Sequence, residues 1–225
     1  MKVGVVTFPG TLDAQSTERA VELAGNEPVA LWHGDADLKG VDAVILPGGA
    51  SHGNYVRPGA LAALSPIMEA IAKAAVQGMP VLGIGNGFQI LCEANLLPGA
   101  FVSNQDGAYI SRAMQFKVSN DSVWTREYED DEVVTLPLRT ANGLFVAAPE
   151  VIDELEESGR VVLRFEDDPT GSANAIAGIR NEAGNVVGLT ASVDHAVEAG
   201  FGPATADTLR GGTDGLKVFT SVRAQ

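Results

Sequence analysis

A strand, a glycine-flanked turn and a helix are expected to follow one another within residues 81–91, and this segment constrains the fold more than any other. It reads Val-Leu-Gly-Ile-Gly-Asn-Gly-Phe-Gln-Ile-Leu. An apolar run that ends at a glycine-rich turn and continues into a helix is typical of a nucleophile elbow, a strained turn that lifts one residue above the end of a sheet. The residue predicted at the apex is Gly85, which has no side chain to present.

Apolar segments alternate with helical patterns over the first 95 residues, which predicts a doubly wound, mostly parallel α/β sheet of the flavodoxin-like type. Strands are expected at residues 2–7, 29–32, 41–46 and 81–84, and helices up to about residue 24 (capped by Thr11 or Asp13), at 61–76 and at 86–95. From residue 111 short strands dominate, which predicts an antiparallel extension. They are expected at residues 114–118, 133–136, 144–146, 161–165, 175–179 and 186–189, with helices at 149–157 and 216–222, a hairpin turn at 181–185 and a loop at 203–212.

The chain shows neither an internal repeat nor a linker, so one domain spanning residues 1–225 is expected. Its 15 basic and 29 acidic side chains give a net charge of -14. Such a charge disfavours binding to nucleic acid and favours a partner with a basic surface. We expect no membrane span and no N-terminal leader, and the single cysteine, Cys92, fits a reducing cytoplasm better than a disulfide framework.

Several motifs resemble class I glutamine amidotransferases. The elbow reads Gly-Ile-Gly-Asn-Gly-Phe-Gln over residues 83–89, where the glutaminase subunits of phosphoribosylformylglycinamidine synthase carry Gly-Ile-Cys-Asn-Gly-Phe-Gln. Further matches lie, in the same order along the chain, at residues 1–10, 44–49, 92–99, 187–189 and 194–198. The chain is therefore identified as resembling that family over most of its length, which implies the fold predicted above and a site at the elbow.

The resemblance implies a Cys-His-Glu triad, and this chain departs from it at each position. Gly85 stands at the place of the cysteine. The family's His-Pro-Glu-His segment matches Ser-Val-Asp-His at residues 192–195, so Ser192 replaces the catalytic histidine and Asp194 the glutamate. A glycine cannot attack an amide, because it offers no nucleophilic atom. His195 matches the second histidine, whose role in the family is structural.

The same resemblance places a ligand site around the elbow. Gly48 and Gly49 would present backbone N–H groups to an oxyanion, together with the N–H of Asn86. We also consider Ser51, His52, Gln89 and His195 as ligand-binding candidates. A second interpretation of the glycines and amides that this elbow shares with the family is that the tight turn and the packing of the helix require them.

The replaced triad leads to the expectation of a catalytically inactive, glutaminase-like protein that acts as a scaffold for a large synthetase-like subunit. The alternative is an enzyme of altered chemistry that acts on a small amide, ester or amino-acid-like ligand. Such a site would use Ser51, His52, Ser192, Asp194 or His195. Neither a metal nor a cofactor is expected.

Overall fold

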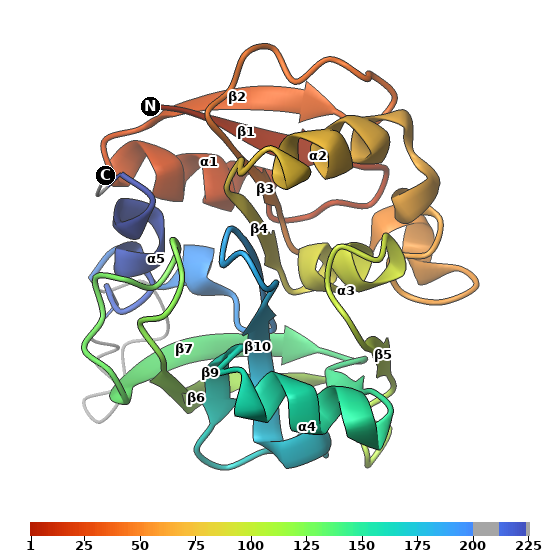
Figure 1. Ribbon diagram of the computed structural model, residues 1–225, viewed down its shortest axis with the longest axis vertical. Coiled ribbons are helices and arrows are strands. Elements are labelled where there is room, and N and C mark those ends of the chain that lie inside the picture. Colours follow the sequence, from red (N-terminus) through yellow and green to blue (C-terminus); the bar gives the residue numbers. More distant parts are fainter. Residues whose placement is uncertain (200–211, 224–225) are drawn as a thin grey trace.

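A mixed sheet runs through the computed structural model, which describes residues 1–199 and 212–223. In this part of the chain the sheet has nine strands in the order β2-β1-β3-β4-β11-β10-β9-β6-β7 (Figure 1). The parallel strands are β1 Lys2–Thr7, β2 Glu27–Trp32, β3 Ala43–Leu46, β4 Val81–Ile84 and β11 Val186–Leu189. The antiparallel extension comprises β10 Ile176–Arg180, β9 Val161–Phe165, β6 Ile110–Val118 and β7 Glu132–Thr140. The predicted fold class is thereby confirmed.

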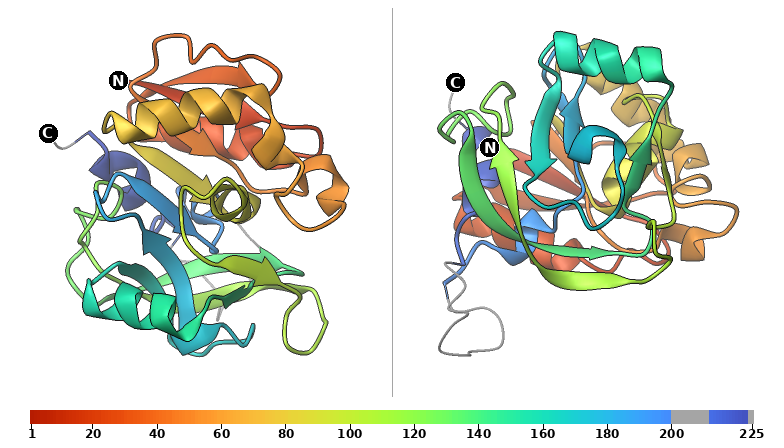
Figure 2. Two further views of the ribbon diagram at one scale, coloured as in Figure 1. Left: turned by 45° about the vertical axis from the view of Figure 1, so that its right-hand side comes forward. Right: turned by 90° about the horizontal axis from the view of Figure 1, so that it is seen from below.

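Helices lie on both faces of the sheet, as Figure 2 shows. They are α1 Ala14–Leu23, α2 Pro66–Val76, α3 Asn86–Glu93, α4 Pro149–Glu157 and α5 Leu216–Ser221, with 3₁₀ turns at Ser51–Asn54, Ala62–Leu64, Ala173–Ala175 and Val193–His195. One apolar core joins α1 and α5 to the sheet through Val21 and Phe219. A second core, on the other face, holds Ile71 of α2 and Phe88 of α3. Two cores explain why the strands in the middle of the sheet are buried along their whole length.

Local structure departs from the sequence-based expectations at three places. The helix expected at 61–76 begins only at Pro66, because Ser65 precedes a proline and is extended (φ -70°, ψ 145°). A short strand, β5 Ala100–Val102, pairs with β8 Leu144–Val146 and was not predicted. Asp13 precedes α1, but its side chain makes no capping hydrogen bond. The loop expected at 203–212 lies, except for Gly212, outside the described residues.

The remaining elements lie within a few residues of their predicted bounds, including the hairpin turn between β10 and β11. Within residues 1–199 and 212–223, no helix is long and apolar enough to cross a membrane.

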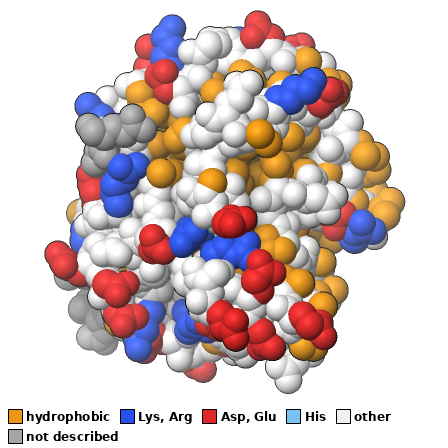
Figure 3. Space-filling view, in the orientation of Figure 1, with side chains coloured by type: hydrophobic (Ala, Val, Ile, Leu, Met, Phe, Trp, Pro, Cys, Tyr) orange, Lys and Arg blue, Asp and Glu red, His pale blue; other side chains and the backbone are white. Residues whose placement is uncertain are grey.

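Acidic and basic side chains lie next to one another over the lower half of the face in Figure 3. Around α4 they form ion pairs, in which Arg160 contacts Glu154 at 2.6 Å and Arg164 contacts Glu156 at 2.8 Å. Some of the acidic side chains are thus paired locally, although the net charge stays at -14.

Candidate functional site

The predicted elbow is present between β4 and α3. Gly85 has φ 53° and ψ -108°, a conformation that strains any residue with a side chain. Its N–H donates a 2.8 Å hydrogen bond to the carbonyl of Leu189, which fixes the apex to β11. A Cβ built at Gly85 would lie 3.9 Å from Gly48 Cα and 4.0 Å from the Thr190 carbonyl oxygen. The apex therefore has open space where a side chain would stand.

The neighbouring glycines have no such space. A Cβ at Gly83 would lie 2.6 Å from the backbone of Gly87, and a Cβ at Gly87 would collide with the carbonyl of Leu46. These contacts support the interpretation that packing requires both glycines.

A cleft of about 300 Å³ opens above the elbow, at the carboxyl ends of β3, β4 and β11. Its lining includes six of the predicted site residues, namely Gly48, Gly49, Gly85, Asn86, Gln89 and Ser192. Arg139 and Thr190 line it as well, and the Thr190 hydroxyl is buried without a hydrogen-bond partner among the described residues. Ser51, His52, Asp194 and His195 do not line this cleft.

The side-chain amides at the start of α3 are bonded to the surrounding loops. Asn86 donates to Gln89 Oε1 at 2.8 Å and to Asn54 Oδ1 at 3.2 Å, and its own oxygen accepts from the Ser51 N–H at 2.9 Å. Gln89 donates to the carbonyl of Asn142 at 2.8 Å. The network ties both walls of the cleft to α3. The N–H groups of Phe88 and Gln89 donate to the Gly85 carbonyl at 3.1 and 3.3 Å, so those of Asn86 and Gly87 are the ones that precede the first hydrogen bond of the helix.

Asp13 connects the cleft to His195. One carboxylate oxygen accepts a 2.7 Å hydrogen bond from Arg139 Nη2, and the other lies 3.1 Å from His195 Nε2. Arg139 Nε in turn lies 3.4 Å from the Ser192 hydroxyl. Burial tends to raise the pKa of Asp13, but the hydrogen bonds from His195 and Arg139 outweigh it and hold the pKa below its usual value. Asp13 is therefore a charged group that positions a guanidinium beside Ser192.

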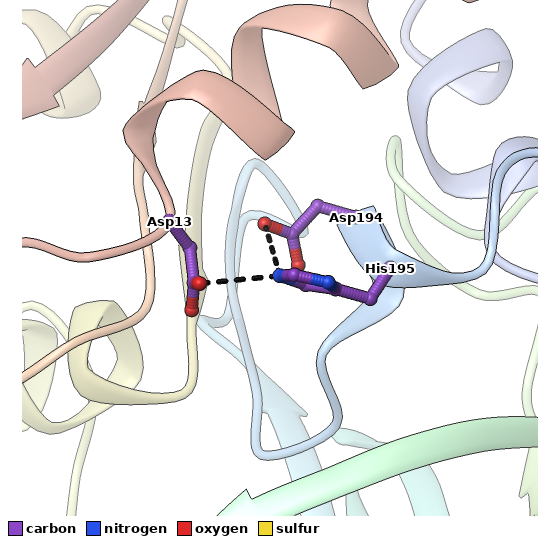
Figure 4. A group of neighbouring side chains, drawn as sticks. All are labelled: Asp13, Asp194 and His195. Atoms are coloured by element: carbon purple, nitrogen blue, oxygen red, sulfur yellow. Dashed lines mark hydrogen bonds and ion pairs between the residues drawn. The ribbon is translucent and has the colours of Figure 1, made fainter. Parts of the chain in front are cut away.

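Asp194 lies behind this contact, in the core between α1 and the 3₁₀ turn Val193–His195. Its side chain is fully buried, and one oxygen accepts a 3.0 Å hydrogen bond from the Thr17 hydroxyl. Burial raises the pKa of Asp194 to about 6. Figure 4 shows that the carboxylates of Asp13 and Asp194 both face the same ring nitrogen of His195.

The structure does not assemble the predicted alternative site. Ser51 Oγ and His52 Nε2 are both buried, and neither has a hydrogen-bond partner among the described residues. His195 contacts Asp13 through its ring rather than Ser51 or Ser192. Among the described residues, neither His52 nor His195 is therefore hydrogen-bonded to Ser51 or Ser192, as the serine–histidine pair of the alternative would require.

Cys92 does not replace the missing thiol at the apex. It is buried on α3 and contacts the carbonyl of Pro98 at 3.5 Å. Burial, with the nearby Glu93 charge, raises the pKa of its thiol. This agrees with the predicted role as a core side chain.

The fold and the elbow define a class I glutamine amidotransferase domain, and the comparisons agree. The chain belongs to the family of CobB/CobQ-like glutamine amidotransferase domains, whose model matches residues 1–224. It is 54% identical to the phosphoribosylformylglycinamidine synthase subunit PurQ of Leifsonia xyli subsp. xyli, over 99% of this chain and 97% of that protein. The subunit of the same name from Frankia casuarinae is 51% identical, over 98% of this chain and 92% of that protein.

Among solved structures, the fold is similar to a chain of PurLQS from Thermotoga maritima. The TM-score is 0.87 and the sequence identity 39%, and the match covers 99% of this chain and 97% of that chain. The full length of the domain, and not only its elbow, is therefore shared with this structure.

These relatives contradict the expectation of a catalytically inactive scaffold. Proteins 50–54% identical over nearly the whole chain carry the name of the synthase subunit. Three departing positions do not outweigh a likeness that extends over nearly the whole chain. The assignment of Gly85, Ser192 and Asp194 to triad positions stays a prediction.

Sequence reasoning missed Asp13 and Arg139 as parts of the site. From the sequence, Asp13 is expected only as a helix cap, and Arg139 is not singled out. The sequence carries one weak signal for them, since each follows a predicted strand closely, at the edge of the sheet where sites of this fold lie.

Proposed function

We propose that this chain is the PurQ-type subunit of a phosphoribosylformylglycinamidine synthase and works in complex with a large synthetase subunit. The observation that carries the proposal is the 54% identity over 99% of the chain to a subunit of that name. Similarity to a chain of PurLQS supports an assembly of several different subunits. A cytoplasmic location and a single domain over residues 1–225 remain part of this proposal.

The cleft above Gly85 is the proposed site for glutamine. Gly48, Gly49 and Asn86 would offer backbone N–H groups to the carboxamide oxygen, as helix N-termini and glycine turns do for oxyanions. The Ser192 and Thr190 hydroxyls line the same space. Arg139, which Asp13 holds at 2.7 Å, adds a positive charge at the wall.

The glutaminase route of the family starts from a thiolate at the elbow apex, and Gly85 supplies no thiol. The proposal therefore covers the place of the chain in the synthase and the binding of glutamine. Turnover is measured directly, as glutamate released by the complete complex.

Exposed apolar side chains beside the cleft suit a docking surface. Leu12 and Tyr109 line the cleft and are 77% and 64% exposed. Tyr55 and Val56, on the nearby loop, are 73% and 81% exposed. Val56 also has φ 71°, a strained conformation for a β-branched residue that often marks a functional segment.

The test is to co-express the chain with the large synthetase subunit of its own host and to purify the complex by size exclusion. We expect the two to co-elute, and glutamine to raise the melting temperature of the complex. Tyr55→Asp should weaken the association, whereas Val76→Asp, on the exposed end of α2, should not. Elution of this chain alone, with no change in synthetase activity on mixing, would contradict the proposal.

A further inference from the structure

Two carboxylates and one imidazole converge next to the cleft, as Figure 4 shows. Asp13 lines the cleft, whereas Asp194 and His195 do not. Asp13 Oδ1 lies 3.1 Å and Asp194 Oδ2 lies 4.0 Å from the same atom, His195 Nε2. One ligand atom from each of these three side chains lies within 4.8 Å of the others. A neutral imidazole can donate only one hydrogen bond from this nitrogen, so it cannot satisfy both carboxylates.

The Asp194 carboxylate has too few partners for its burial. Its side chain is 0% exposed, and Oδ2 accepts one hydrogen bond, from Thr17. Oδ1 is buried and has no hydrogen-bond partner among the described residues. A buried carboxylate has about four acceptor sites, and leaving them empty is costly. The group therefore requires either a proton or a cation close by.

The surrounding charges leave room for a cation. With a neutral imidazole, the carboxylates of Asp13 and Asp194 face the single guanidinium of Arg139. The next charged groups, Arg19 and Glu198, form their own ion pair at 2.7 Å. Arg19 and Glu198 neutralise one another, so they do not offset the negative charge of the Asp194 carboxylate.

Space for water and a route to solvent adjoin the cluster. A cavity of about 70 Å³ is lined by Asp194 and His195, by Ser16 of α1, by Val197 and by the paired side chains of Arg19 and Glu198. A water molecule takes about 30 Å³ in the liquid, so the cavity has the size of roughly two. Water could complete the coordination of an ion that three side chains hold.

We propose that Asp13, Asp194 and His195 form a binding site for a divalent transition-metal ion of the Zn²⁺ type. Imidazole nitrogen and carboxylate oxygen are ligands that such ions accept, and three protein ligands leave a position for water. Bonds of about 2.0–2.2 Å place tetrahedral ligand atoms roughly 3.3–3.5 Å apart. The 3.1 Å between Asp13 Oδ1 and His195 Nε2 is close to that separation. Asp194 Oδ2 lies 4.0 Å from His195 Nε2 and the three ligand atoms lie within 4.8 Å of one another, so Asp194 needs to approach by up to about 1.5 Å. The ion would also fix Asp13, and through it Arg139 at the cleft.

The test uses the full-length chain without a histidine tag, stripped of metal by a chelator. Zn²⁺ is added in a calorimetric titration, and Co²⁺ serves as a spectroscopic probe of the ligand set. We expect one ion per chain, a rise in melting temperature with Zn²⁺, and an affinity at least about 100-fold lower in His195→Gln and Asp194→Asn. His33→Gln, which removes a half-buried histidine elsewhere, should bind as the native chain does.

Metal binding by the native chain and by His195→Gln distinguishes a bound ion from a proton as the partner of Asp194. Absence of binding to the native chain, or equal binding by His195→Gln, overturns the proposal and leaves a proton as the partner of Asp194. If circular dichroism shows that Asp194→Asn does not fold, His195→Gln decides, because that side chain is 19% exposed and its loss leaves no cavity in the core. The readout is metal binding, so it does not depend on the proposed activity.

Discussion

Arg139 Nη2 and Asp13 Oδ2 are joined by a 2.7 Å hydrogen bond across 126 residues of sequence. The contact fastens β7, in the antiparallel extension, to the residue that precedes α1, beside the parallel strands. It also explains why the Asp13 side chain does not cap α1. The two parts of the sheet therefore meet at the cleft through a charged pair.

Removing the Asp13 charge should destabilise the fold. In Asp13→Asn the Arg139 guanidinium, a third exposed, loses its mostly buried charged partner, and we expect a loss of about 1–2 kcal/mol in the free energy of unfolding. Urea denaturation at pH 7 measures it. The control is Asp153→Asn, an exposed position on α4, which should change stability by less than about 0.5 kcal/mol. Equal effects of the two substitutions would contradict the role assigned to Asp13.

Alanine substitutions should separate the elbow glycines into two groups. Gly85→Ala has free space for its Cβ, so only backbone strain destabilises it. We expect a loss of about 1–3 kcal/mol in the free energy of unfolding. Gly83→Ala forces a Cβ against the Gly87 backbone and should cost more, or prevent folding. Thermal melts of the two purified proteins make the comparison. A Gly83→Ala protein as stable as Gly85→Ala would show that the close contact relaxes easily.

The accessibility of thiols should distinguish the apex from the helix behind it. The native chain has one cysteine, Cys92, which is buried and has a raised pKa, so iodoacetamide should label it slowly. Gly85→Cys adds a thiol that faces the cleft, and we expect it to react at least about tenfold faster. Mass spectrometry of the modified peptides gives both rates in the same sample. Fast labelling of Cys92 in the native chain would contradict the buried position of α3.

The Glu156–Arg164 pair should make a stability contribution that depends on pH. Burial tends to raise the pKa of Glu156, but hydrogen bonds from Arg164 and Asn174 lower it below its usual 4.5. A depressed pKa stabilises the fold above the pKa of the unfolded chain, and the contribution is lost as pH falls through the folded value.

We therefore expect Glu156→Gln to lose up to about 1 kcal/mol at pH 7, since both side chains are about a third exposed and solvent screens the pair. The difference from the native chain should shrink below pH 4.5. Urea titrations over pH 3–7 test this, because the midpoint of the unfolding transition reports stability. Glu157→Gln, an exposed neighbour on α4, should show no such trend.

The fold class could be predicted because its signals are local. The apolar runs of β1 and β4 and the glycines of the elbow are contiguous in sequence, and each predicts its own backbone conformation. The turn residues Asn-Glu-Ala-Gly-Asn at 181–185 also predicted the hairpin between β10 and β11. The start of α2 was missed because the effect of Pro66 on Ser65 outweighed helical spacing, and β5 was missed because a strand of three residues carries little pattern.

The site was predicted in part. The sequence by itself determined the elbow, with Gly85 at its apex and Asn86 opening α3, because chain neighbours and backbone sterics set that turn. Only the tertiary structure decided that Asp13 faces Arg139 and His195, and that Asp194 lies beside Thr17, 177 residues away. Such pairs depend on the spatial order of the strands in the sheet and on burial, which removes water from charged groups. The spacing of residues along the chain predicts neither of these.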